Sequence, residues 1–71
     1  MNRINGWEFY LKIKDLSKRE GARMNVATVI RELGIKDDLA REYLTALAVL
    51  KFIEFTDVAK EEFLITDLGM E

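Results

Sequence analysis

The sequence predicts an α+β domain that is mainly α-helical, with three helices followed by a two-stranded β-hairpin. Residues 26–33 and 38–51 repeat their apolar side chains at the spacing of an α-helix. After Lys51 apolar and polar residues alternate instead, which is the period of a β-strand. A chain of 71 residues is long enough for one domain with one core, and we expect its stability to be small.

The first helix is predicted at about residues 5–20. Apolar residues also alternate over residues 7–14, so a strand is the alternative interpretation of this segment. The helix is favoured because Leu16 continues a helical stripe with Phe9 and Ile13, and because Gly21 lies where a helix C-cap is expected.

This helix carries a second apolar face, formed by Ile4, Trp7 and Leu11. A helix that is apolar on two sides has more than one surface to cover. Trp7 is expected either in the core or, if exposed, in a homodimer interface with Ile4 and Leu11. A small core gives dimerisation a role in stability as well.

The second helix is predicted at about residues 26–33, after a short extended segment at 22–25. Asn25 is a good N-cap residue, and Gly34 is expected to end the helix.

The third helix is predicted at about residues 38–51, with Asp37 or Asp38 as its N-cap. At 100° per residue one face is apolar, with Leu39, Ala40, Tyr43, Leu44, Leu47 and Leu50. The opposite, exposed face carries Asp38, Arg41, Glu42, Thr45 and Ala48.

The hairpin is predicted at about residues 52–66. Ile53 and Phe55 face one way in its first strand, and Phe63 and Ile65 repeat the pattern after the loop DVAKEE. Leu68 is expected to close the end of the core.

Three segments resemble the winged helix-turn-helix family. "NVATVIRELGI" is similar to its second helix and turn, "DDLAREYLTALAVLKFIEF" to its third helix and first wing strand, and "FLITDLGME" to its closing signature. The resemblance covers residues 22–71, and residues 1–21 agree only by position. It implies a three-helix winged helix-turn-helix with the hairpin as its wing.

The resemblance also implies a function, namely a homodimeric transcriptional regulator of a prokaryote or virus that binds duplex DNA. The third helix would then enter the major groove, where Arg41 suits guanine, Glu42 suits cytosine and Thr45 a phosphate or thymine methyl. Lys60 would be the basic residue of the wing. Lys36 and Arg31 would flank the groove, with further cations in the first helix.

The charge distribution opposes tight DNA binding. Residues 1–36 carry eight basic and four acidic side chains, whereas residues 37–71 carry three basic and nine acidic ones. The half that contains the expected DNA-contacting elements therefore has a net charge of −6. Since phosphate contacts supply much of DNA affinity, the alternative is a protein-docking module that uses its acidic third helix and wing or its apolar first helix.

Other functional classes have little support. The sequence has no histidine or cysteine, and its one serine, Ser17, has no recognisable base, so it does not predict an enzyme. No cofactor and no metal site are expected, since the acids near Asp37 are explained by the start of a helix. The N-terminus lacks an apolar signal segment, and no stretch approaches the roughly 18 apolar residues of a membrane span. A cytoplasmic protein is therefore expected.

Overall fold

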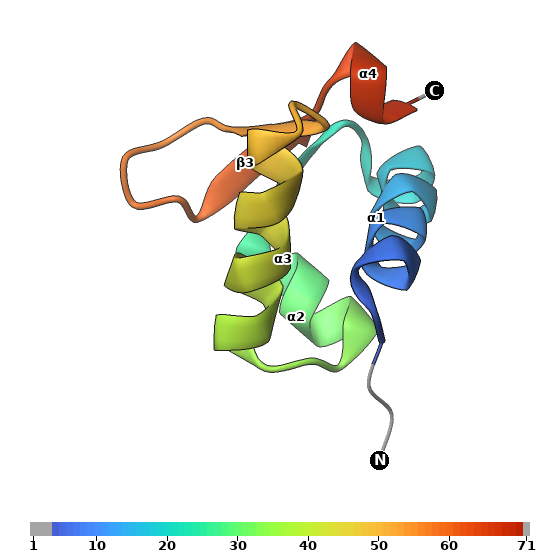
Figure 1. Ribbon diagram of the computed structural model, residues 1–71, viewed down its shortest axis with the longest axis vertical. Coiled ribbons are helices and arrows are strands. Elements are labelled where there is room, and N and C mark those ends of the chain that lie inside the picture. Colours follow the sequence, from blue (N-terminus) through green and yellow to red (C-terminus); the bar gives the residue numbers. More distant parts are fainter. Residues whose placement is uncertain (1–3, 71) are drawn as a thin grey trace.

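The computed structural model describes residues 4–70, and it confirms a mainly helical α+β fold. The segment whose pattern fitted both a helix and a strand is a helix. Figure 1 shows the arrangement of the elements, which follow one another as α1 (Gly6–Glu20), β1 (Arg23–Asn25), α2 (Val26–Leu33), α3 (Asp37–Val49), β2 (Ile53–Phe55), β3 (Glu62–Ile65) and α4 (Asp67–Met70).

The first two helices begin at asparagine caps. The Asn5 side chain accepts from the Glu8 amide at 2.8 Å, and the Glu8 carboxylate accepts from the Asn5 amide, which completes a capping box. Asn25 accepts from the Thr28 amide at 2.9 Å, as the sequence predicts. Gly34 ends α2 in the left-handed conformation, with φ of 66°.

The sheet in residues 4–70 has three antiparallel strands, in the order β1-β3-β2, so the predicted two-stranded hairpin was incomplete. Met24 pairs with Phe63, and Phe55 pairs with Phe63 on the other side. The extended segment predicted at residues 22–25 contains strand β1, but its pairing with β3 was not predicted, because three residues are too few to show an alternating pattern.

A fourth helix, α4, follows β3, so residues 4–70 contain one helix more than the three that were predicted. Its four residues include Gly69, a poor helix former, so the sequence carries little signal for α4. Gly69 is buried against Phe52, and a Cβ at this position would overlap the Phe52 carbonyl oxygen. Leu68 is 48% exposed, so the prediction that it closes the core was wrong.

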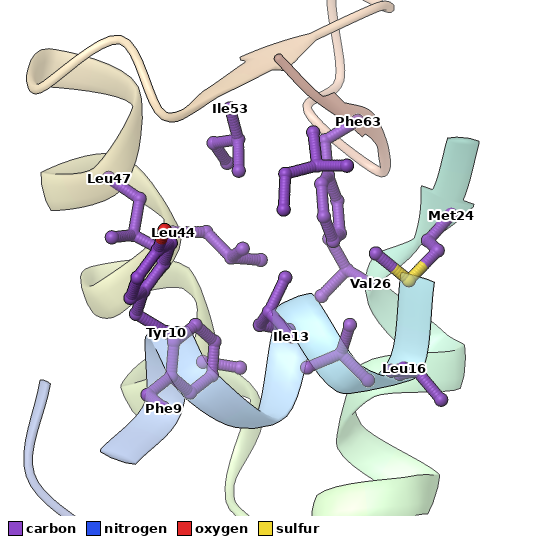
Figure 2. Close-up of a cluster of buried hydrophobic side chains, with 13 residues drawn as sticks. Phe9, Tyr10, Ile13, Leu16, Met24, Val26, Leu44, Leu47, Ile53 and Phe63 are labelled. Atoms are coloured by element: carbon purple, nitrogen blue, oxygen red, sulfur yellow. The ribbon is translucent and has the colours of Figure 1, made fainter. Parts of the chain in front are cut away.

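The core lies between the helices and one face of the sheet (Figures 1 and 2). Phe9 and Ile13 of α1, Leu44 of α3 and Phe63 of β3 are fully buried. The predicted core faces of α1 and α3 are therefore confirmed for Phe9, Ile13, Leu16, Ala40, Leu44 and Leu47.

Helix α3 ends at Val49, two residues before its predicted end. The cause is Lys51, whose φ of 69° is left-handed and cannot continue a helix. The amide of Phe52 donates to the Leu47 carbonyl at 2.9 Å, which closes the last turn in the manner of a Schellman motif. This turn directs the chain from α3 into β2.

Candidate nucleic-acid interface

The exposed face of α3 agrees with the helical period at Asp38, Glu42 and Thr45. The prediction was wrong for Ala48, which packs against the core, and for Leu50, which was expected on the apolar face and is 56% exposed. Glu42 and Thr45 are exposed and Arg41 is partly exposed, while Ala40 and Leu44 on the opposite side are fully buried. Packing of the apolar face therefore fixes which side chains α3 presents to a partner.

Helix α3 starts differently from the prediction. Lys36 occupies the N-cap position, and its ammonium group has no acceptor with which to cap the helix. Asp37 and Asp38 lie inside the first turn, so the prediction that one of them is the N-cap was wrong. There they still complement the helix dipole. The Asp38 carboxylate accepts from the Leu39 amide at 2.9 Å, whereas Asp37 has a side-chain partner.

That partner is Arg41, which joins α3 to the β2–β3 loop (residues 56–61). Its Nε donates to Asp37 Oδ1 at 2.9 Å, and its Nη1 donates to the backbone carbonyl of Lys60 at 3.0 Å. We call this pair of contacts the Arg41 bridge. A guanidinium group has five N–H donors, so other donors remain for a ligand.

The β2–β3 loop is organised around the Asp57 side chain. Its Oδ1 accepts from the amides of Glu61 and Glu62, both at 2.9 Å. Lys60 adopts a left-handed φ of 58°, and its ammonium group lies 5.8 Å from the centre of the Phe55 ring. Val58 is fully exposed within this loop. The loop therefore has a defined conformation and presents both a cation and an apolar side chain.

Acidic side chains outnumber basic ones around the Arg41 bridge. Lys36, the first two turns of α3 and the β2–β3 loop carry three basic side chains, which are Lys36, Arg41 and Lys60. The acidic ones are Asp37, Asp38, Glu42, Asp57 and Glu61. A phosphate approaching this surface meets donors, but its negative charge is not favoured by the surroundings.

The remaining predicted cations are Arg31 of α2 and the basic side chains of α1. Arg31, in the last turn of α2, has its Nε 3.6 Å from a carboxylate oxygen of Glu32. Helix α1, which carries the largest group of lysines, lies on the opposite side of the molecule from the β2–β3 loop (Figure 1). The structure therefore brings Lys60 to Arg41 and keeps the α1 cations apart from both.

The predicted dimer residues differ in exposure. Trp7 is 65% exposed and Leu11 is 43% exposed, which decides against a core position for Trp7. Ile4 is partly buried and packs against the core, and its carbonyl accepts from the Tyr43 hydroxyl at 2.8 Å.

Two features of this region were missed from sequence. Asp57 organises the β2–β3 loop, and an aspartate at the start of a hairpin loop is a signal for such a role. The hydrogen bond from Arg41 to the Lys60 carbonyl could not be predicted from the sequence. It joins a side chain to a backbone group nineteen positions away, and a backbone carbonyl does not depend on the residue type.

No family model, no curated protein and no solved structure matches this chain. Among residues 4–70, no three His, Cys, Asp or Glu side chains are grouped so that they could hold a metal ion. No helix in the same described range has the length and apolar character needed to cross a membrane.

Proposed function

We propose that this chain is a winged-helix DNA-binding domain that acts as a cytoplasmic transcriptional regulator. The hairpin β2–β3 is its wing, and α3 is the helix that enters the major groove. One observation carries the proposal: the Arg41 bridge holds the β2–β3 loop beside the exposed face of α3. A helix and a loop fixed next to each other can contact the same duplex, one in the groove and one on the backbone.

The roles of the side chains follow from their chemistry. Arg41 has N–H donors left for the acceptors of guanine, and Thr45 and Glu42 lie on the same exposed face. Lys36 and Lys60 would contact phosphates, and Arg31 is a weaker candidate because of its nearby Glu32.

The acidic surroundings predict weak, salt-sensitive binding. With three phosphate contacts, the logarithm of the binding constant should fall with the logarithm of salt concentration at a slope of about −3. Fluorescence anisotropy with a labelled random duplex, titrated at several salt concentrations, measures this slope. Arg41→Ala and Lys60→Ala should each weaken binding, and Lys60→Ala should make the slope less negative by about 1.

Lys18→Ala is the matched control, since Lys18 is an exposed lysine of α1, on the far side from the loop. It should leave both the affinity and the slope unchanged. Absence of binding at about 20 mM salt, where phosphate contacts are strongest, would end the DNA proposal. If Lys18→Ala lowers the DNA affinity as much as Lys60→Ala does, DNA binds at α1 and not only at α3 and the β2–β3 loop.

A second candidate function is protein docking through the acidic surface of α3 and the β2–β3 loop. The observation that favours it is the excess of acidic side chains around the Arg41 bridge, with the α1 cations on the opposite side. Such a surface suits a partner rich in lysine and arginine. In the same anisotropy assay, binding of a labelled Lys/Arg-rich peptide but not of DNA would favour this candidate.

A further inference from the structure

A hollow of about 250 Å³ lies where the end of α1, strand β1, the start of α2 and strand β3 meet. The side chains and backbone around it belong to Glu20, Arg23, Met24, Asn25, Thr28 and Glu62. Pockets for drug-sized ligands measure about 300–1,000 Å³, so this hollow suits a smaller molecule. It contains two carboxylates and one guanidinium group, and these charges decide which molecule fits.

The pairing of β1 with β3 places charged side chains of the hollow on one face of the sheet. Asn25 lies opposite Glu62, so these two side chains share a face. Arg23 points to the same face, because side chains alternate along a strand and the intervening Met24 is buried in the core. Arg23 and Glu62 are therefore diagonal neighbours, about 7–8 Å apart. Glu20 ends α1, three positions before Arg23.

The charged groups of the hollow are not paired with one another. Arg23 forms no ion pair with Glu20 or Glu62, and its guanidinium donates no hydrogen bond to residues 4–70. One oxygen of Glu62 accepts from the Thr56 hydroxyl at 3.3 Å, and its other oxygen remains as an acceptor. The Asn25 oxygen caps α2, which leaves the NH2 group of this side chain as a further donor.

We propose that this hollow binds a free basic amino acid such as L-lysine. Two carboxylates and one guanidinium group match a molecule that carries two cations and one carboxylate. The lysine carboxylate would pair with Arg23 and the Asn25 NH2 group, and its two ammonium groups with Glu20 and Glu62. The inference goes beyond the proposed function, because neither DNA binding nor protein docking at α3 and the β2–β3 loop uses this hollow.

Other small molecules leave a charge of the hollow unpaired. A diamine has no carboxylate for Arg23, and it brings cations next to the guanidinium group. A neutral amino acid has one cation for the two carboxylates of Glu20 and Glu62. A phosphate or a dicarboxylate meets two like charges, which is unfavourable.

The charged residues next to the hollow in sequence do not alter this match. Arg19 lies beside Glu20, and its Nη2 is 3.9 Å from a carboxylate oxygen of Glu32. Glu61 lies beside Glu62 and adds a further negative charge. A ligand with a net positive charge, as lysine has, is therefore favoured over a neutral one.

NMR titration of the isotope-labelled protein with L-lysine at constant ionic strength measures the affinity. We expect a Kd of about 1–10 mM, because ion pairs of exposed side chains are individually weak. The largest shifts should occur at the amides of residues 20–25 and 62. Norleucine lacks the side-chain ammonium group of lysine and cadaverine lacks its carboxylate, so each should bind about three- to fivefold more weakly.

Two variants locate the site. Glu62→Gln should weaken lysine binding about three- to fivefold, and Arg23→Gln should make lysine and cadaverine bind with nearly equal affinity. Glu54→Gln is the matched control for Glu62→Gln, because Glu54 is an exposed acid of the same sheet that does not line the hollow. It should leave the Kd for lysine unchanged.

The absence of shifts at about 50 mM lysine would overturn the proposal. Equal affinities of the wild type for lysine and norleucine, or for lysine and cadaverine, would also overturn it, because the charge match would then have no effect. Equal weakening by Glu54→Gln and Glu62→Gln would do the same, since it would show that lysine is attracted by acidic surface in general.

Discussion

Two tyrosine hydroxyls donate to backbone carbonyls far along the chain, and their surroundings differ. Tyr10 donates to Gly69 at 2.6 Å in a buried site, and Tyr43 donates to Ile4 at 2.8 Å in a partly buried one. Water can replace a lost partner more easily at a partly buried carbonyl than at a buried one. The same chemical change should therefore have different effects at the two positions.

We expect Tyr10→Phe to lower the free energy of unfolding by about 1–3 kcal/mol, because the Gly69 carbonyl loses its partner in a buried site. Tyr43→Phe, the matched control, should cost about 0.5 kcal/mol. Urea unfolding followed by circular dichroism measures both values. A larger loss in Tyr43→Phe than in Tyr10→Phe would contradict this account.

At the scale of elements, the Arg41 bridge relates the β2–β3 loop to α3 without burying apolar surface. The Arg41 side chain is 37% exposed and that of Asp37 is 61% exposed, so their ion pair is expected to add little to global stability. Its effect should appear in the loop, whose amides are held mainly by Asp57.

Arg41→Ala should accordingly increase hydrogen exchange at the Glu61 and Glu62 amides by about 3- to 10-fold, a local opening cost of roughly 1 kcal/mol. The midpoint of urea unfolding should hardly change. Exchange measured by NMR, residue by residue, tests this expectation. Arg31→Ala is the control, because the Arg31 side chain is exposed and pairs with Glu32 on α2. Equal loop exchange in both variants would show that the bridge does not order the loop.

Elements with several turns were predictable, and short ones were not. Helices α2 and α3 repeat apolar residues over enough turns to show their period, and Asn25 and Gly34 mark the ends of α2. Strand β1 and helix α4 are three and four residues long, so they depend on contacts with β3 and α1 rather than on local preference.

Of the candidate site, only the residues on the exposed face of α3 could be predicted, because they follow from the helical period. The exposed positions of Arg41, Glu42 and Thr45 follow from the burial of the opposite face of α3. The two partners of Arg41 could not be predicted. Asp37 was expected, with Asp38 as the alternative, to cap the helix, and the Lys60 carbonyl is a backbone group that any residue would supply.

For the molecule as a whole, stability depends on one core to which the helices α1–α3 and all three strands contribute. Phe63 is fully buried in the central strand, and its ring lies 6.5 Å from that of Phe55. Because a chain of 71 residues buries a small core, its free energy of unfolding is expected to be small.

Phe63→Ala should lower the free energy of unfolding by about 3–5 kcal/mol, comparable to the whole stability of a small domain. The thermal midpoint should fall by more than about 12 °C. Differential scanning calorimetry measures it, with Leu68→Ala as the control at a half-exposed apolar position. A fall of only a few degrees in Phe63→Ala would mean that the core tolerates a cavity at this site.

The order of strands in the sheet has a consequence for how the chain folds during its synthesis. The central strand, β3, is the last of the three along the chain, and Arg23 of β1 pairs with Leu64. Neither outer strand has a partner until residues 62–65 have been made. A nascent chain that has produced α1, α2 and α3 therefore still exposes the apolar faces that Phe63 and Ile65 later cover. Final folding has to wait for these residues, and for that interval the unfinished protein is open to aggregation.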